Sequence, residues 1–514
     1  MRKSFLLSGA AAGALIMLCA QAQAGTLYIS RLSNANEPAG TAPSAATGIG
    51  SLILNDAGTS ATVRVTHNEA LVNPSPVILG HIHRGPQGAN GPVVFPFPNP
   101  NSPIGPLVWA IPAADVTNLQ NGLLYTNIHT QQNPGGDMRG QLIRALLAPS
   151  ATGGTQLAVA NALDVSAGYD TDLDLLLIAV NTGTATLKAQ ALDDLSGRTL
   201  YLLGREGVES MWTMERSVLA HAQATRMGGT DGTRDVGKFG IFASAGSDVT
   251  MRDPSTEESG ARGSRPYFLG GVDYSFSDSA RAGLAFGYPS GKNRVKFRGG
   301  ETKGETKALQ AYFSAGIGES NVAVDGTLGY GWTDFTTTRS LTSIGRTATG
   351  ATSGNTFGGA IKVSMSSKMG ENARISPYAL LDYRSADIKG YSEGGAGSVG
   401  LVVPGHKVKN SFGELGAVVS VPSTQSWGML SGQFQLGYTY LLERGAGTLT
   451  TGLVGSPVTF QTVLTGPGRS AAHVGAAAVA STSEGMTATL AYDGMIGATR
   501  LTSHMISAHI SFAF

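Results

Sequence analysis

The chain of 514 residues has a single cysteine and few charged residues for its length. Lys and Arg number 36 against 35 Asp and Glu, charged residues make up 14% of the chain, and the formal net charge is +1. One cysteine excludes a disulfide-bonded scaffold and a zinc site built from cysteines. Because the charge is balanced and there is no long basic run, we expect no nucleic-acid partner.

A long hydrophobic run is also missing after the first residues. No later stretch is apolar for 18 residues, whereas a transmembrane helix needs about 20. Hydrophobic residues nevertheless make up 41% of the chain, which is too many for a disordered protein. Any insertion into a membrane must therefore use β-strands.

Residues 1–24 are typical of a secretory signal peptide. A positive start at Arg2 and Lys3 precedes an apolar run from Phe5 to Leu18, and small residues predict cleavage after Ala24. The run is too short for a membrane anchor. The only cysteine, Cys19, follows a Leu rather than the small residue that a lipoprotein signal needs. We expect it to be removed, which leaves a mature chain without a thiol.

The mature chain divides into three zones, and the first, residues 25–147, predicts an antiparallel β-sandwich. Short β-prone runs alternate with loops rich in Gly, Pro and Asn, a spacing typical of sandwiches. The expected strands are 27–31, 48–54, 61–67, 78–83, 93–95, 107–111, 123–129 and 138–146.

Residues 148–235 predict a helical linker. Ala- and Leu-rich segments with helical spacing cover 157–163, 173–180, 187–195 and 200–227. The last segment carries charged residues on more than one side, namely Arg205, Glu206, Glu209, Glu215 and Arg216. Such a helix does not suit a protein core, and a polar surrounding such as a wet channel suits it better.

From residue 236 to the end, the pattern has a period of two, typical of β-strands. Leu328, Tyr330 and Trp332 share one face of their segment, whereas Asp325 and Thr327 lie on the other. A soluble sandwich with one buried face would alternate in the same way.

Three features favour a 12-stranded transmembrane β-barrel over a sandwich. The candidate strands run to about 10 residues or more, long enough to cross a bilayer when tilted. Aromatic residues gather near strand ends. The connections 277–278 and 318–319 are tight, whereas 247–263, 291–304 and 338–350 are long and polar. The expected strands begin near Val236, Ser264, Ser279, Glu305, Asn321, Ser353, Ala373, Lys407, Ser426, Ser470, Met486 and Thr502.

Three segments of the C-terminal half carry a family resemblance: Ala-Leu-Asp-Asp-Leu-Ser-Gly at 191–197, Gly-Lys-Phe-Gly-Ile-Phe at 237–242, and the aromatic end Phe512-Ala513-Phe514. With the long β-pattern, they resemble the linker and β-barrel translocator of the autotransporters (type V secretion). This resemblance implies the outer membrane of a Gram-negative bacterium and a helix at 200–227 that threads the barrel. It also implies periplasmic chaperones, and a barrel-assembly machinery that reads Ile510, Phe512 and Phe514. In any barrel, Phe514 would also face lipid.

Four blocks in the first zone carry a second resemblance: Gly-His-Ile-His-Arg-Gly at 80–85, Gly-Pro-Val-Val at 91–94, Leu-Tyr-Thr-Asn-Ile-His-Thr at 124–130 and Pro-Gly-Gly-Asp-Met-Arg-Gly-Gln-Leu at 134–142. Together they resemble the CHRD domain, first named from chordin. Asp137 stands where the family more often has Glu. Because the Asp side chain is shorter, a role that requires the length of Glu is less well supported here. The family has no settled activity, so this resemblance implies a fold more than a function.

The histidines of these blocks suggest a metal site. On a strand, residues two apart face the same way, so His81 and His83 project together, as do Asn127 and His129 on another strand. If the strands pair, three imidazoles and Asp137 could bind zinc or copper. Alternatively, these side chains bond only to the backbone or to each other, and Asp137 with Arg139 pins a Gly-rich turn. A superoxide-dismutase-like interpretation is disfavoured, because His-x-His is too common a spacing.

The sequence contains no His-Glu-x-x-His, Walker-type or EF-hand motif, so we expect no enzyme. The linker also lacks the Asn-Asn pair used by self-cleaving members of the translocator family, so the N-terminal domain is expected to stay attached.

We expect an outer-membrane autotransporter that displays its CHRD domain at the cell surface, for binding or adhesion to an unknown extracellular ligand. The alternatives are a surface metal-binding protein or metalloenzyme, and a channel with a periplasmic CHRD domain.

Overall fold

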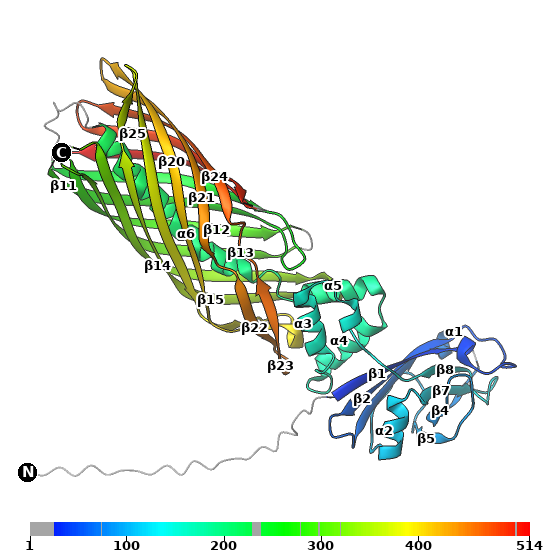
Figure 1. Cartoon of the computed structure of the whole chain (residues 1–514). Helices are drawn as coiled ribbons and strands as arrows, with labels where there is room; N and C mark the ends of the chain where they lie inside the picture. The colour runs from blue at the N-terminus through cyan, green and yellow to red at the C-terminus, as the bar shows by residue number, and fades with distance from the viewer. Residues whose placement is uncertain are drawn as a thin grey trace, which may run out of the picture.

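The computed structural model describes residues 25–72, 75–228, 238–277, 279–296, 299–318, 320–498 and 501–514. The expected signal peptide, with Cys19 and Ala24, lies outside these ranges, as do Val236, Asp278 and Glu319. Figure 1 shows three parts in a row: an N-terminal β-domain, a group of short helices, and a barrel with a long helix inside it.

The N-terminal domain is one antiparallel sheet of nine strands, in the order β5-β4-β7-β8-β1-β2-β3-β6, with β9 beside β1. Two helices accompany it, α1 (Glu69–Val72) and α2 (Ala113–Gln120). The strands are β1 (Gly25–Ser33), β2 (Thr47–Asn55), β3 (Ala61–His67), β4 (Val77–Arg84), β5 (Val93–Pro96), β6 (Ile104–Trp109), β7 (Leu124–Thr130), β8 (Met138–Gln141) and β9 (Ile143–Arg144).

The sheet curls until it is nearly closed, so that its two halves face each other. Buried side chains from both halves, among them Leu52, Val63, Ile82 and Ile128, pack into one core. The predicted antiparallel β-fold is therefore confirmed. The number of sheets differs from a sandwich, which has two. Here β8 pairs with β1, so all nine strands belong to one sheet.

Up to Leu195, the linker folds into three α-helices, α3 (Gly154–Leu163), α4 (Thr171–Thr182) and α5 (Ala185–Leu195). The Asp170 and Thr184 side chains accept hydrogen bonds from the first-turn amides of α4 and α5, which satisfies donors that a helix start leaves free. Among the described residues, no helix is both long and apolar enough to cross a membrane.

A second sheet, of four short strands, receives these helices. It contains β18 (Tyr391–Ser392), β19 (Leu401–Val403), β22 (Gly447–Leu453) and β23 (Ser456–Leu464). Val159 and Leu192 of the helices share a buried core with Leu401 and Phe460 of this sheet, and Leu27 of β1 joins the same core. The linker therefore packs on the barrel loops and on the N-terminal domain together.

Twelve strands form the closed barrel, because β15 pairs with β17 and β10 pairs with β26. The short β16 (Ser367–Met369) continues β15. The barrel strands are β10 (Phe239–Arg252), β11 (Ala261–Ser277), β12 (Ala280–Val295), β13 (Glu301–Gly316), β14 (Val322–Leu341), β15 (Arg346–Met365), β17 (Ala373–Ile388), β20 (His406–Gln425), β21 (Gly428–Arg444), β24 (Ser470–Thr482), β25 (Met486–Ala498) and β26 (Leu501–Ala513).

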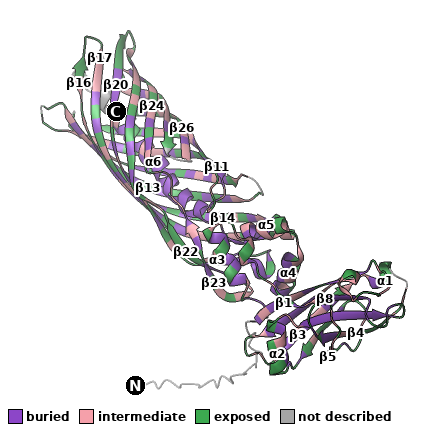
Figure 2. Cartoon of the chain, turned by 45° about the vertical axis from the view of Figure 1, so that its right-hand side comes forward, coloured by how far each residue is buried: buried purple, intermediate pink, exposed green. Residues whose placement is uncertain are grey.

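The predicted number of barrel strands is confirmed, and so is the alternation along them. In β14, Leu328, Tyr330 and Trp332 are exposed on the outer face, whereas Asp325 and Thr327 are buried towards the lumen. Figure 2 shows exposed and buried positions alternating along the barrel strands. This is the pattern of strands that meet lipid on one side.

The expected long loops were wrong in extent, since 247–263, 291–304 and 338–350 are largely strand. The outer face of β13 explains why. Leu309 and Phe313 are exposed near one end, but Lys303 and Lys307 are exposed towards the other. There the strands continue past the apolar band. Because their outward-facing side chains are polar, the sequence of these segments is typical of a loop.

Candidate functional site

The helix α6 (Tyr201–Gly228) lies inside the barrel, where it contacts strands β11 to β15, β17, β20 and β25 (Figure 1). At its start, the Tyr201 hydroxyl donates to the Ser259 carbonyl, 2.7 Å away, in the loop between β10 and β11. Near its other end, Gln223 lines a cavity together with Ser320 and Asn321, which adjoin a short turn. The prediction of a helix that threads the barrel is therefore confirmed.

One arginine of the barrel wall binds two carboxylates of this helix. Arg265 of β11 donates to both oxygens of Glu206, at 2.9 and 2.7 Å, and to Glu209 at 3.0 Å. It also donates to Asp248 of β10 at 2.9 Å. Asn293 of β12 donates to Glu206 at 2.7 Å. Strands β11 and β12 thus bind one turn of α6, and β10 binds Arg265. We call Glu206, Glu209, Asp248, Arg265 and Asn293 the upper charge cluster.

Glycines of the wall give Glu206 its space. A Cβ atom at Gly291 would lie 1.7 Å from the Glu206 Oε1 atom, and one at Gly304 would lie 2.5 Å from its Cγ atom. Neither distance is possible for real atoms in contact. The barrel interior is therefore shaped for this side chain and not merely wide enough for a helix.

A second group of charges lies further along α6. Arg384 of β17 has its Nε atom 2.5 Å from Asp382 and 3.8 Å from Glu215 of the helix. Its guanidinium also lies over the ring of Trp212, 4.8 Å from the centroid. The polar surrounding expected for α6 is thus made mainly by side chains of the barrel wall, rather than by an open wet channel.

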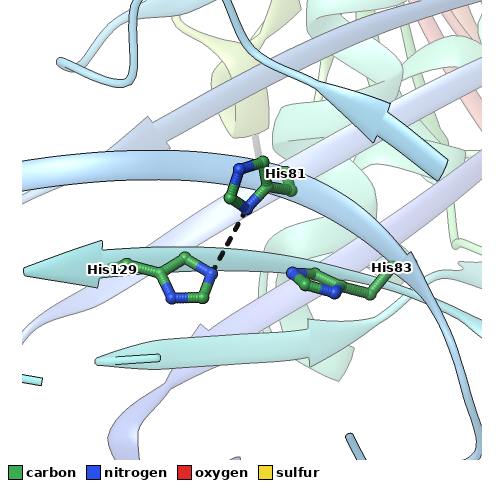
Figure 3. Close-up of side chains that lie close together, drawn as sticks. All are labelled: His81, His83 and His129. Carbon is green, nitrogen blue, oxygen red and sulfur yellow. Dashed lines mark hydrogen bonds between the residues drawn. The ribbon is translucent and has the colours of Figure 1, made fainter. Parts of the chain in front are cut away.

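In the N-terminal domain, three predicted site residues come together. Strands β4 and β7 pair antiparallel, with His81 opposite Asn127 and His83 opposite Tyr125. This register puts His81, His83 and His129 on one face of the sheet. Figure 3 shows their rings turned towards a common point. One ligand nitrogen from each of the three lies within 4.8 Å of the other two, and we call them the histidine cluster.

The hydrogen bonds of the cluster fix which nitrogens face inwards. The Nδ1 atoms of His83 and His129 lie 2.9 and 3.0 Å from the carbonyl oxygens of Gly91 and Pro134. A carbonyl only accepts, so both Nδ1 atoms carry hydrogen and both Nε2 atoms hold a lone pair. The His129 Nε2 atom faces the His81 Nδ1 atom at 3.3 Å. The His83 Nε2 atom is buried and has no hydrogen-bond partner among the described residues.

Burial keeps these imidazoles neutral. His83 and His129 are only 8% and 6% exposed. Desolvation lowers the pKa of all three histidines, and it lowers that of His129 to about 4. All three are therefore unprotonated at pH 7, the form in which histidine binds metal.

The structure does not bring Asp137 into the cluster. Its carboxylate accepts hydrogen bonds from Asn133, at 2.5 Å, and from Thr130, at 3.4 Å. Asn133 in turn donates to the Ala42 carbonyl. Asp137 thus holds the turn between β7 and β8 through Asn133 and Thr130. The expected partner in this role, Arg139, binds Glu37 instead.

The sequence did not predict the residues that pack against the histidine cluster. The Tyr125 ring stacks on His83, with centroids 5.0 Å apart, and the Arg139 guanidinium lies 4.7 Å from the Tyr125 ring centre. Arg139 forms a buried ion pair with Glu37 at 2.6 Å. Arg139 stood in a noted motif, but Glu37 lies in a loop about a hundred residues earlier, where no pattern marked it.

The comparisons with known proteins agree with this architecture. A family model for the autotransporter beta-domain matches residues 241–493, and one for the CHRD domain matches residues 28–142. The barrel is an autotransporter β-domain, and the N-terminal domain is a CHRD domain. No curated protein matches the chain.

Several solved structures are similar to the barrel half of this autotransporter. The translocator domain of NalP from Neisseria meningitidis is 15% identical, with a TM-score of 0.44, over 58% of this chain and 98% of that one. The β-domain of BrkA from Bordetella is 16% identical, with a TM-score of 0.41, over 54% and 100%. The transport unit of AIDA-I from Escherichia coli is 9% identical, with a TM-score of 0.34, over 57% and 97%.

As an autotransporter β-domain, the barrel lies in the outer membrane of a Gram-negative bacterium and meets its lipid. The last strand, β26, closes the autotransporter barrel against β10. Its residues Ile510, Phe512 and Phe514 are exposed on the outer face. They are available to a protein that reads the strand from outside, and recognition by the assembly machinery stays a prediction.

Proposed function

We propose that this autotransporter carries its own CHRD domain to the cell surface and keeps it there. The observation that carries the proposal is the path of α6 through the lumen. The helix starts beside the loop between β10 and β11, and it ends near the short turns. In outer-membrane barrels, short turns face the periplasm and longer loops face outwards. On that rule, the linker and the CHRD domain lie outside the cell.

The tether in this proposal is α6 itself. Its carboxylates are bonded to Arg265 of the barrel wall, and both partners are buried. Leaving one member of such a pair unpaired costs several kcal/mol, so the helix resists sliding back. The linker helices, packed on the four-stranded sheet through one core, support the same position of the domain.

The main alternative is a channel that keeps the CHRD domain in the periplasm. It requires an open lumen and a domain at the short-turn end. The buried hydrogen bonds between α6 and the barrel wall argue against an open lumen. The core shared by the linker helices and the loop strands argues against a domain at the short-turn end.

Protease treatment of intact cells tests the proposal. We expect an added protease to cleave an epitope tag inserted after Ala89, in a CHRD loop, without lysis. The matched control carries the same tag after Glu484, in the short turn between β24 and β25, where it should be cleaved only after the outer membrane is opened. A CHRD tag that stays protected while the Glu484 tag is cleaved would refute surface display.

We further propose that the displayed domain binds or adheres to a partner rather than catalysing a reaction. Support comes from four exposed apolar side chains at the end of α1 and the start of β4: Leu71, Val72, Ile78 and Leu79. Helix α1 lies away from the linker helices (Figure 1). Exposed apolar groups of this kind often mark interaction sites. Retention of intact cells on phenyl-coated beads should fall with Leu71→Ser/Val72→Ser, and should not fall with Val108→Ser, an exposed valine of β6.

A further inference from the structure

We propose that His81, His83 and His129 form a binding site for one borderline divalent transition-metal ion, zinc or copper(II). The site goes beyond display at the cell surface and would belong to the CHRD domain wherever that domain lies. Neutral imidazole nitrogens suit both ions. Three protein ligands would leave at least one coordination position open to solvent or to a bound molecule.

The first argument is the position of the nitrogens. In a tetrahedral site with bonds of 2.0–2.1 Å, two nitrogens lie about 3.3 Å apart. The His81 Nδ1 and His129 Nε2 atoms already lie 3.3 Å apart, and His83 offers a third nitrogen within 4.8 Å of both. Small side-chain rotations of His83 and its neighbours would complete the set.

The second argument is the unpartnered His83 nitrogen. If the cluster were only a hydrogen-bonded structure, His81 would donate to His129 and both would be satisfied. The His83 Nε2 atom would remain buried without a partner, and an unsatisfied buried polar group costs about 1–3 kcal/mol. A metal ion satisfies this nitrogen and the other two together.

The third argument is the support of the rings. Metal-binding histidines usually donate their other nitrogen to a carbonyl or a carboxylate, which fixes the ring and its tautomer. His83 and His129 do so towards Gly91 and Pro134. The Arg139 charge behind Tyr125 would repel a cation, but its ion pair with Glu37 offsets it. The loops that carry these carbonyls thus hold two ligands ready before any ion arrives.

Metal uptake by the full chain in detergent tests the site. After treatment with a chelator, the protein is dialysed against Zn²⁺ alone or Cu²⁺ alone, and bound metal is measured by mass spectrometry. We expect one ion per chain. His83→Gln and His129→Gln should each weaken binding at least about tenfold, in line with the losses seen when metal sites are perturbed. The matched control is His67→Gln, a histidine of the same domain outside the cluster, which should bind like the wild type.

The Cu²⁺ form gives a second readout that does not depend on affinity. Its electron paramagnetic resonance spectrum should show three coupled nitrogens in the wild type and in His67→Gln, and two in His81→Gln. His81 is the least buried of the three ligands, so this variant should still fold. Competition between equal amounts of the two ions then decides between zinc and copper.

Two results would overturn the proposal. One is a wild-type chain that binds no more metal than the variant with all three histidines changed to Gln. The other is a spectrum that is the same in the wild type and in His81→Gln, because the ion would then lie elsewhere. Neither result bears on surface display, since uptake is measured on purified protein and display on intact cells.

Discussion

Arg265 and Glu206 form two parallel hydrogen bonds across the barrel lumen, from Nε at 2.9 Å and from Nη2 at 2.7 Å. The side chains are 1% and 0% exposed. The pair joins strand β11 to helix α6, which are about sixty residues apart in the chain. Because both charges are buried, each depends on the other, and the barrel and its helix behave as one folded unit.

Replacing Arg265 by Met should destabilise this unit strongly. The change leaves the Glu206, Glu209 and Asp248 carboxylates buried without their shared partner, which costs about 3–5 kcal/mol. We expect the variant barrel to unfold at a lower temperature in the gel assay that separates folded from unfolded barrels. Its conductance in planar bilayers should also rise, because α6 is held less firmly in the lumen.

A barrel arginine outside the lumen provides the control for this prediction. Arg294 of β12 has a side chain that is 72% exposed, and its one ion contact with a described residue is to Glu301, at 3.6 Å. Arg294→Met should leave both the unfolding temperature and the conductance unchanged, since exposed ion pairs contribute little. Equal effects of the two changes would mean that the upper charge cluster does not hold the helix.

Gly291→Ala tests whether the space for the Glu206 side chain matters, because it changes that space and leaves every charge of the cluster in the chain. The added methyl group would lie 1.7 Å from the Glu206 Oε1 atom, so the carboxylate must move and its bonds to Arg265 must weaken. We expect a lower unfolding temperature for the barrel in the same gel assay. Gly432→Ala is the matched control, because a Cβ atom there meets nothing within 4 Å.

A double variant sharpens the glycine prediction. In a Glu206→Ala background, the side chain that clashes with the new methyl group is absent. Gly291→Ala should then lower the unfolding temperature much less than it does in the wild type, as coupled neighbours do. If the loss is the same in both backgrounds, the methyl group acts through strand β12 rather than through the helix.

The sequence alone predicts the barrel well, because lipid and lumen impose a simple alternation on each strand. Eleven of the twelve expected strand starts lie among the described residues, and the largest error is at β15, expected near Ser353 and found at Arg346. That error has a physical cause. Above the apolar band both faces of a strand are polar, so the alternation disappears although the hydrogen bonding continues.

Partners across the lumen could not be predicted in the same way. The scattered charges of α6 indicate a polar surrounding, but the choice of Arg265 and Asn293 as partners depends on the rotation of the helix and on the register of the strands. The four-stranded loop sheet was missed as well. Its strand β19 has only three residues, too few for a periodic pattern, and it is stabilised by the linker helices that pack on it.

For the histidine cluster, the period of two along a strand predicts that residues 81 and 83 face the same way, and that residues 127 and 129 do so too. Their convergence depends on the register between β4 and β7, which the sequence does not encode locally. Asp137 shows the limit of the argument. Its position in the motif suggested a ligand, yet its carboxylate turns to Asn133, because a local hydrogen bond competes well for a short side chain.

Leu192→Ala should loosen the linker from the barrel loops. Leu192 of α5 is fully buried in the core that joins linker, loops and β1, and such a truncation costs about 2–5 kcal/mol. We expect faster tryptic cleavage at Lys188 and Arg198 in the purified chain. Leu175→Ala in α4 is the control, because Leu175 is 51% exposed, and its cleavage rate should match that of the wild type. Equal rates for all three proteins would mean that this core does not hold the linker.

Acid should destabilise the CHRD domain through His67. Its Nε2 atom lies 2.9 Å from the Pro100 carbonyl, and its Nδ1 atom is buried without a hydrogen-bond partner among the described residues. Burial lowers the pKa of His67 below its usual value, so the unfolded chain takes up a proton first as the pH falls. The contribution to stability is therefore complete above about pH 6.5 and is lost as the pH falls towards the folded pKa.

The urea midpoint of the domain, followed by pulse proteolysis of the whole chain in a chelator, measures this loss. Between pH 7.5 and pH 5 the wild type should lose more stability than His67→Gln, whose amide can still donate to Pro100 but does not titrate. The chelator removes any contribution of a bound metal, and the other histidines of the domain titrate alike in both proteins, so the difference isolates His67. Parallel losses in the two proteins would mean that His67 is protonated as readily in the folded domain as in the unfolded chain.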